Sequence, residues 1–440
     1  MERAKLIVKN FGPIKDIEIE VREMVTFIGA QASGKSTLAK LLSIFEDEAF
    51  RKDNTITFKG ELKKYNILSY LKDDSYISYG NSLEKEIPFF TFEYERKISK
   101  KLSLSLFDKI SHKQLKQEHI ETSLSISDFK QLVEMTINDY ELIDKVNFTK
   151  IFDSKSQVLS FENTFKNIRV VNSNVIREIL QLFKKEESVE NYLFLFNKII
   201  NSFPNIFLFD SIYVPSERNF IHLIAENTLG LINNNVRIPK HLLHIGQEYE
   251  KAIQTIKELP LTIIDKKLKY KREGKTSYVY HDKDEKIDLL ESASGLQSII
   301  PILLLVEYSK SLKDKYNFNF VVEEPELNLY PKAQHELIKY LIKNCVYERK
   351  NLILTTHSPF VLASINNLLL AYDKGQSKPK EVNKIIKKES WLNPKNFIAY
   401  ELKNGKAKKI MDDKLGQIKE NMIDSVSDSF ADEFDKLLDL

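Results

Sequence analysis

Apolar and polar residues alternate over residues 4–21 on either side of a Gly-Pro pair, which predicts two antiparallel strands joined by a turn. Short, mainly apolar runs follow at 24–30, 206–214, 317–323 and 351–356, and polar residues come directly after each of them. Stretches with helical spacing separate these runs. Buried strands that alternate with helices indicate a parallel α/β sheet, whose ligand is expected along the edge formed by the carboxyl ends of the strands.

Other parts of the pattern predict hairpins and helices. Residues 87–97 with 100–108, and residues 268–291, are expected to form antiparallel hairpins. Residues 112–205 contain no glycine and have helical periodicity, so they predict a helical insertion. This insertion is either a lobe packed on the core or an arm that binds a partner. After residue 366 we expect Lys-rich hairpins and then an acidic helical tail.

Composition narrows the class of protein. With 440 residues, 42% hydrophobic and 29% charged, the chain suits a soluble protein of two or three domains. A net charge of +3 does not by itself indicate a nucleic-acid partner. Because Cys345 is the single cysteine, an internal disulfide is excluded, and we expect this residue to pack between a helix and its neighbours. No signal-peptide pattern and no membrane-length apolar run is present, so a cytoplasmic protein without a membrane span is expected.

The segment GAQASGKS, residues 29–36, fits the phosphate-binding pattern G-x-x-x-x-G-K-[ST] between a predicted strand and a predicted helix. Its glycines let the backbone curl so that N–H groups face the phosphates. Lys35 is expected to bridge the β- and γ-phosphates of ATP or GTP, and Ser36 to bind Mg²⁺. The expected nucleotide-binding residues are Gly29, Ala30, Gln31, Ala32, Ser33, Gly34, Lys35, Ser36 and Thr37.

Three carboxylates, Glu323, Glu324 and Glu326, stand at the end of the apolar run 317–323. Such a cluster is costly unless a cation neutralises it, as a Mg²⁺–nucleotide complex would. We expect Glu323 to bind Mg²⁺, directly or through water, and Glu324 to orient and deprotonate the attacking water. His357 ends the next apolar run, only one helix later, so it is expected at the same edge, in reach of the γ-phosphate.

The segment SASGLQS, residues 292–298, places a Ser-Gly turn before a long apolar helix and so offers a second anion site. One P-loop already serves the chain, so Ser294 and Gly295 are expected to complete the nucleotide site of a second copy in a twofold dimer. The simpler alternative is that Ser292 or Ser294 only caps the helix.

The order of P-loop, Ser-Gly segment, Glu-Glu strand and His strand resembles that of the ABC-type ATPases. The segments YVPSER, SGLQSIIPILLL, EEPELNLYP and TTHSPFVL resemble the soluble SMC/RecF/OLD-like branch, with its AAA-15 and AAA-21 stand-alone ATPases. The resemblance covers residues 1–50 and 206–365. It implies Mg²⁺-dependent ATP binding, head-to-head dimerisation through the nucleotide and slow hydrolysis.

The resemblance also implies a fold: an α/β ABC-type P-loop head with a mostly parallel core sheet flanked by helices, an antiparallel side-sheet and a helical insertion. The expected segments are an N-terminal ATPase lobe at 1–111, the helical insertion at 112–205, a C-terminal ATPase lobe at 206–365 and a C-terminal extension at 366–440.

Two features depart from the family pattern. No glutamine occurs between Gln31 and Gln114, so the glutamine that helps to hold Mg²⁺ in transporter-type heads is missing or replaced. The residues after His357 contain no D-x-D motif, so the Toprim nuclease of many OLD-like proteins is expected to be absent. The effector, a nuclease or toxin, would then be a separate protein.

Several weaker signals have two interpretations each. Phe11 could contact the adenine or pack in the core, and Arg218 could touch phosphates or an interface, or form a surface salt bridge. The basic hairpin could bind DNA or RNA phosphates, or form a solvated strand face; its basic residues are Lys266, Lys267, Lys269, Lys271, Arg272 and Lys275.

Three functions are consistent with these features. The leading hypothesis is an ATP-dependent sensor or scaffold in bacterial antiphage defence, because the motifs resemble stand-alone ATPases such as the AriA ATPases of PARIS systems. The second is a RecF- or SMC-like ATPase of DNA repair or DNA binding. The third is a scaffold that binds ATP without useful turnover.

Overall fold

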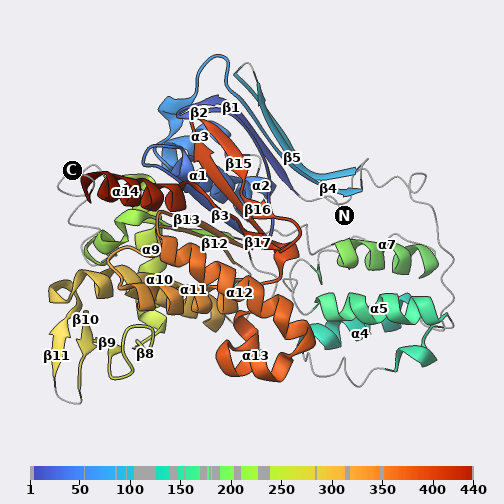
Figure 1. The fold of residues 1–440 in the computed structure, drawn as a ribbon. Helices are drawn as coiled ribbons and strands as arrows, with labels where there is room; N and C mark the ends of the chain where they lie inside the picture. The colour runs from blue at the N-terminus through green and yellow to red at the C-terminus, as the bar shows by residue number, and fades with distance from the viewer. Residues whose placement is uncertain are drawn as a thin grey trace.

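A six-stranded sheet lies at the centre of the computed structural model, with the strand order β15-β14-β3-β13-β12-β7 (Figure 1). Its strands are β3 (Met24–Gly29), β7 (Asp210–Val214), β12 (Phe318–Glu323), β13 (Leu352–Thr356), β14 (Phe397–Lys403) and β15 (Lys406–Lys409). All neighbours pair in parallel except β14 and β15. The structure describes residues 4–53, 55–84, 87–95, 97–103, 125–138, 147–152, 154–168, 176–177, 180, 189–202, 210–225, 238–282, 285–312, 318–346 and 351–438.

Burial explains why the sequence of this sheet is mainly apolar. Every residue of β3, β12 and β13 is buried, as expected for parallel strands covered on both faces. Helix α1 (Lys35–Phe45) lies on one side of the sheet, and α10 (Ser294–Ser311), α11 (Pro331–Cys345) and α12 (Pro359–Ser377) lie on the other (Figure 1). The predicted α/β class with a mostly parallel core is therefore confirmed.

A second, antiparallel sheet has the order β2-β1-β4-β5-β6. It consists of β1 (Lys5–Phe11), β2 (Ile14–Glu20), β4 (Tyr76–Glu84), β5 (Ile87–Glu95) and β6 (Ile98–Ser103). The predicted N-terminal strand pair and the predicted hairpin of β5 and β6 are confirmed. Three short helices, α2 (Glu48–Lys52), α3 (Phe58–Lys64) and η1 (Leu68–Tyr70), connect α1 to this sheet.

An aromatic cluster joins α1 to the antiparallel sheet. Phe45, in the last turn of α1, stacks on Tyr79 and Phe58 with ring centroids 5.1 and 5.8 Å apart. It also contacts Phe50 and Phe92, and all five rings are buried. The helix that begins at the P-loop is thereby anchored at its far end.

Helices α4 (Ile126–Asn138), α5 (Lys155–Ile168) and α7 (Val189–Ser202), with the short η3 (Phe148–Lys150), lie within the predicted helical insertion. They form a separate group in Figure 1 and pack on one another around Phe129, whose ring meets Phe161 and Phe196 edge-on. The rest of the predicted segment 112–205 lies outside the described residues.

The segment between β7 and β12 supplies a small sheet and a long helix. After β7 come η6 (Ser216–Phe220) and α9 (Lys240–Thr255), followed by the sheet β11-β10-β9-β8. Its strands are β8 (Glu258–Pro260), β9 (Lys269–Glu273), β10 (Thr276–Tyr280) and β11 (Lys286–Asp288), and the short η7 (Leu289–Glu291) leads to α10. The predicted hairpin is confirmed, with Glu273 paired to Thr276.

The C-terminal part differs from the expectation of hairpins from residue 366 onward. Helix α12 runs through that position, and α13 (Pro379–Ile385) and the short η8 (Lys388–Ser390) and η9 (Pro394–Asn396) follow it. Strand β14 then pairs in parallel with β3, so the P-loop strand has neighbours on both sides. The hairpin of β16 (Met411–Asp412) and β17 (Gln417–Ile418) precedes the acidic helix α14 (Met422–Leu438), which confirms the predicted tail helix.

Two further expectations have structural answers. Cys345 is fully buried in α11, as predicted. Among the described residues no helix is both long and apolar enough to cross a membrane.

The aromatic cluster generates a stability prediction. Phe45→Ala should lower the free energy of unfolding by about 3–5 kcal/mol, because it removes a buried ring and leaves a cavity. Chemical denaturation followed by circular dichroism measures this change. Ile385→Ala is the control, since Ile385 is 82% exposed and its removal should change stability by less than about 0.5 kcal/mol. Equal midpoints for the two variants would contradict the assigned role of the cluster.

Candidate nucleotide-binding site

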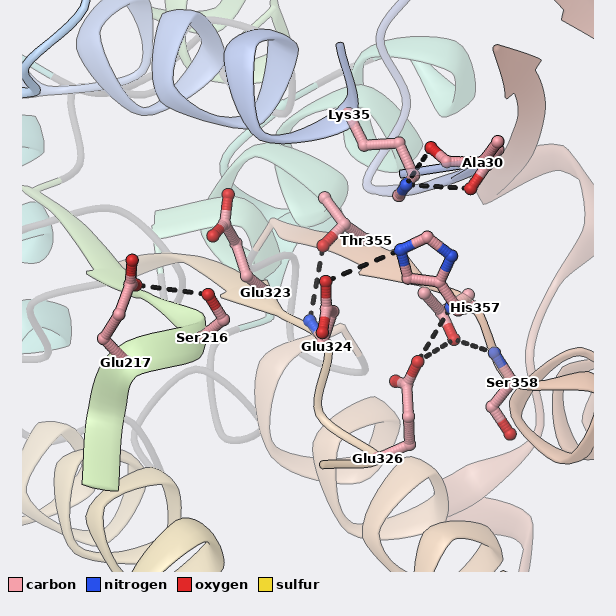
Figure 2. A network of polar contacts seen from close by, with 12 residues as sticks. Ala30, Lys35, Ser216, Glu217, Glu323, Glu324, Glu326, Thr355, His357 and Ser358 are labelled. Carbon is pink, nitrogen blue, oxygen red and sulfur yellow. Dashed lines mark hydrogen bonds and ion pairs between the residues drawn. The ribbon is translucent and has the colours of Figure 1, made fainter. Parts of the chain in front are cut away.

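The P-loop connects β3 to α1 at the carboxyl edge of the central sheet. Gly34 has a φ of +104° and stands at the N-cap of α1, a conformation that a side chain would oppose. The Nζ atom of Lys35 donates to the carbonyls of Gly29 and Ala30 at 2.8 and 2.9 Å, so the ammonium lies inside the curl of the loop (Figure 2). Thr37 is buried in the first turn of α1.

Charge and burial act against each other at Lys35. The side chain is 5% exposed, and burial lowers the pKa of its ammonium. The carboxylates at the end of β12, Glu324 first among them, act in the opposite direction. The Oγ atom of Ser33 is buried without a partner among the described residues. The loop therefore holds a buried cation and an unsatisfied hydroxyl, which suit an anionic ligand.

Glu323 is the last residue of β12 and is 3% exposed. Its Oε1 atom has no hydrogen-bond partner within the described part of the chain, and burial raises the pKa of its carboxyl. Lys40 opposes this rise in pKa most strongly, followed by Ser36 and Tyr213, although none of them satisfies Oε1. A buried carboxylate oxygen without a partner beside the Ser36 hydroxyl fits a hard divalent cation such as Mg²⁺.

Glu324 and His357 face each other at the ends of the adjacent strands β12 and β13. Their Oε1 and Nε2 atoms are 3.6 Å apart (Figure 2). Burial lowers the pKa of His357, and the positive charge of Lys35 lowers it further. Glu324 has a φ of +43°, a strained value for a residue with a side chain, and its N–H donates to the carbonyl of Thr355 at 2.9 Å. Both side chains are partly open to solvent.

Glu326 makes no described contact with the Glu324 carboxylate or the His357 ring and instead holds the turn after β13. Its Oε1 atom accepts from the Thr356 hydroxyl at 2.7 Å and from the His357 N–H at 2.8 Å (Figure 2). The Ser358 N–H in turn donates to the Thr356 hydroxyl at 3.0 Å. Of the three predicted carboxylates, Glu326 therefore fixes the backbone that carries the imidazole.

The Ser-Gly segment forms the start of α10. Ser294 is exposed in the first turn, and the N-cap residue Ala293 supplies no side-chain cap. The Ser292 hydroxyl instead donates to the carbonyl of Leu289 at 2.7 Å, so the simple capping alternative is wrong. Gly295 is required by packing, because a Cβ there would lie 2.7 Å from the Asn328 carbonyl oxygen. Among the described residues, no hydrogen bond joins Ser294 or Gly295 to the P-loop.

Arg218 occupies a place that neither sequence interpretation predicted. It is fully buried, and its guanidinium donates only to backbone carbonyls in the described contacts. The partners are Glu323 at 2.8 Å, Glu324 at 2.7 Å, Ser298 at 3.0 Å and Pro215 at 3.3 Å. Burial lowers the pKa of Arg218 to about 10. A surface salt bridge and a contact at a dimer interface are both excluded by this burial.

His222, one turn further along, was not predicted at all. Its Nε2 atom lies 3.0 Å from the Gln297 carbonyl and its Nδ1 atom 2.7 Å from the Tyr249 hydroxyl. Because a carbonyl only accepts, Nε2 carries the proton and the Tyr249 hydroxyl donates to Nδ1. Burial lowers the pKa of His222 to about 4, so the ring is neutral at pH 7.

Other residues near the site also lacked a sequence signal. Lys40 and Tyr213 act on the pKa of Glu323, and Glu217 follows β7 and faces the end of β12 (Figure 2). Lys40 lies one helical turn after Ser36, a spacing that could have identified it. Tyr213 and Glu217 require the pairing of β7 with β12, which the sequence does not reveal.

Of the two remaining weak signals, the structure decides the one at Phe11. Phe11 is fully buried and packs edge-on against Tyr70, so it is a core aromatic. In the basic hairpin, Lys269 pairs with Glu258 at 2.6 Å and Lys271 with Glu273 at 3.2 Å. These pairs occupy two of the six basic residues, so binding of DNA or RNA by this hairpin stays a prediction.

The fold and the clustered residues define a P-loop ATPase head. The chain belongs to the AAA ATPase domain family (AAA_15), whose sequence pattern it matches over residues 1–362. No curated protein matches the chain.

Solved structures with a similar outline include heads of SMC proteins. The SMC head with an extended coiled coil from Pyrococcus furiosus, bound to the C-terminal domain of ScpA, is 11% identical with a TM-score of 0.37, covering 93% of this chain and 96% of that one. The SMC head from Thermotoga maritima is 10% identical with a TM-score of 0.35, covering 93% and 98%. RecF from the RecFOR pathway is 13% identical with a TM-score of 0.30, covering 93% and 99%. These scores are low, so the family assignment rests on the sequence match.

His222 generates a pH prediction. Its pKa is about 4 in the folded protein and about 6.5 in an unfolded chain, so the unfolded state binds the proton first as the pH falls. The stability that neutral His222 provides should therefore be lost between about pH 6.5 and pH 4. Between pH 7 and pH 5, His222→Gln should lose about 2 kcal/mol less unfolding free energy than the wild type. Denaturant titrations at the two pH values measure this difference, and other histidines cancel because both proteins contain them. Parallel pH dependences would contradict the assigned neutral state.

Proposed function

We propose that this chain is a Mg²⁺-dependent ATP hydrolase that dimerises head to head through its nucleotide. One observation carries the proposal. Lys35 begins the helix after β3, Glu323 and Glu324 end β12, and His357 follows β13, so the four residues lie at the carboxyl edge of three neighbouring parallel strands, which supports a role in cleaving a γ-phosphate.

Each residue has a proposed role in binding or catalysis. The backbone N–H groups of residues 29–34, together with Lys35 and Thr37, bind the phosphates of ATP. Ser36 and Glu323 would hold Mg²⁺, which neutralises phosphate charge when bound. Glu324 orients the attacking water and accepts its proton as the water oxygen bonds to the γ-phosphorus and ADP leaves. His357, beside Glu324, donates a hydrogen bond toward the γ-phosphate.

The proposed dimer follows from the exposure of Ser294. A hydroxyl in the first turn of a long helix, open to solvent, is available to an anion outside its own chain. In a twofold arrangement, Ser294 and Gly295 of each head complete the nucleotide site of the other. The expected assembly is at least a homodimer that forms only with ATP.

The biological role is proposed from the resemblance of the motifs. We propose an ATP-dependent sensor or scaffold switch in bacterial antiphage defence that acts on a separate nuclease or toxin. The alternative is a RecF- or SMC-like ATPase that binds DNA. Two of the six basic residues of the hairpin, Lys269 and Lys271, are paired with glutamates, which reduces the positive charge that this hairpin offers to DNA and supports the first role.

Glu324→Gln tests hydrolysis and dimerisation together. The variant should bind ATP but hydrolyse it about 100-fold or more slowly, because an amide cannot accept the proton from water. Sedimentation should show ATP-dependent dimers of Glu324→Gln and monomers without nucleotide. A Glu324→Gln protein that stays monomeric with ATP would refute the head-to-head dimer.

Lys35→Ala separates the remaining alternatives. It should lose ATP binding in a fluorescent-nucleotide titration, because the buried cation of the loop is gone. If Lys35→Ala abolishes function in cells while Glu324→Gln does not, the protein is a scaffold that binds ATP without useful turnover. ATPase activity that DNA stimulates, with an affinity that falls steeply with salt, would instead support the DNA-binding alternative.

A further inference from the structure

Arg218 connects two parts of the proposed machinery that lie far apart in the chain. Its Nη1 and Nη2 atoms donate to the carbonyls of Glu323 and Glu324, and its Nε atom donates to the carbonyl of Ser298 in the first turns of α10. A single planar guanidinium therefore spans the end of β12 and the start of α10. Because a guanidinium has fixed donor directions, a shift of either carbonyl group costs hydrogen bonds at the other.

His222 makes a second connection to the same helix. Pro301 lies inside α10 and has no N–H, so the carbonyl of Gln297 lacks its helical donor. The Nε2–H group of His222 supplies that donor, and the Tyr249 hydroxyl orients the ring from α9. The two side chains project from one short segment, residues 218–222, and hold consecutive carbonyls of α10.

A third contact joins the start of α10 to the loop after β12. Gly295 packs directly against the carbonyl of Asn328, in the loop that follows Glu324. That loop contains Asn328 at a φ of +60°, and it begins at Glu324 with a φ of +43°. Asparagine tolerates this region, whereas a glutamate there stores backbone strain, which persists only where the surrounding contacts hold it. The hydrogen bond from Arg218 to the Glu324 carbonyl is one of those contacts.

We infer that Arg218 and His222 are positioning residues that couple the Ser294–Gly295 turn to the backbone of Glu324. This inference rests on the proposed function, in which Glu324 acts on the nucleotide of its own head and Ser294 on that of the partner. In such a dimer, one buried side chain links the two nucleotide sites through each head. Docking of Ser294 onto the partner's nucleotide is transmitted to the peptide of Glu324, so a head becomes competent for hydrolysis when its partner is loaded.

Arg218→Lys is the decisive variant, because it keeps the buried charge and removes the fork of donors. ATP affinity should be unchanged, since Lys35 and the P-loop make no described contact with Arg218. The kcat for ATP should fall between about 10-fold and 100-fold at a similar KM, because Glu324 is misplaced by a fraction of an ångström or more. In the Glu324→Gln background, Arg218→Lys should also weaken the ATP-dependent dimer.

Arg22→Lys is the matched control. Arg22 also donates to two backbone carbonyls, those of Pro394 and Phe397, but it lies before β3, at the opposite edge of the sheet. The Arg22→Lys protein should bind ATP, hydrolyse it and dimerise as the wild type does. A thermal melt of both variants establishes that each is folded under the assay conditions.

Two outcomes overturn the inference. The first is a folded Arg218→Lys protein whose kcat and dimerisation equal those of the wild type. The second is an Arg218→Lys protein that loses ATP affinity in proportion to its loss of kcat, because such a loss indicates a merely structural role. If Arg218→Lys does not fold, the pair His222→Ala and His222→Gln decides. Glutamine can donate to the Gln297 carbonyl, so activity should be kept with glutamine and lost with alanine, and equal activities refute the coupling.

The proposed function has a separate failure. If the wild type neither hydrolyses ATP nor dimerises with it, the function itself is wrong. If the wild type hydrolyses ATP and dimerises with it, and the Arg218 and His222 variants do so equally well, the proposed function stands and only the coupling is wrong.

Discussion

The burial of charge at the carboxyl edge of the central sheet is the constraint on which the rest of the structure depends. Lys35, Arg218 and Glu323 are each 5% exposed or less, and isolated charges so deeply placed are costly. The chain offsets this cost in two ways. The guanidinium of Arg218 donates hydrogen bonds to backbone carbonyls. The ammonium of Lys35 donates to the carbonyls of Gly29 and Ala30 and is also attracted by the three carboxylates at and after the end of β12.

These two solutions have different consequences for function. The hydrogen bonds of Arg218 fix the strand end, the strained peptide of Glu324 and the first turns of α10 in one arrangement. By contrast, Glu323 Oε1 and the Ser33 hydroxyl remain without partners in the described structure. The backbone around the site is therefore held in place by hydrogen bonds, while polar atoms inside the site lack partners. This arrangement favours the binding of a charged ligand without reorganisation of the protein.

Most of the candidate site could be predicted from sequence because a parallel sheet brings the carboxyl ends of its strands together at one edge. Once β3, β12 and β13 are recognised as buried strands, their carboxyl ends must be neighbours, and the residues that follow them must meet. The roles of Arg218 and His222 could not be predicted, because they depend on where α10 begins relative to the end of β7. Nothing in residues 215–222 indicates that the carbonyls of residues 297 and 298 lie within reach.

Composition also concealed part of the fold. The strand β14 lies in a Lys-rich stretch, and its hairpin with β15 resembles a surface element, although its first four residues are buried. The antiparallel sheet was predicted except for β4, whose residues Tyr76–Glu84 mix serine, asparagine and glycine with aromatic residues. In both places the pairing partner, rather than the local pattern, decides the structure.

The position of β14 has a consequence for how the protein is made. A Cβ on Gly29 would meet the carbonyl of Leu402, so the first residue of the P-loop rests on a strand synthesised some 370 residues later. During translation the chain therefore displays its phosphate loop long before the strand that supports it leaves the ribosome. We therefore expect the nucleotide site to be completed only after β14 has been synthesised, late in translation.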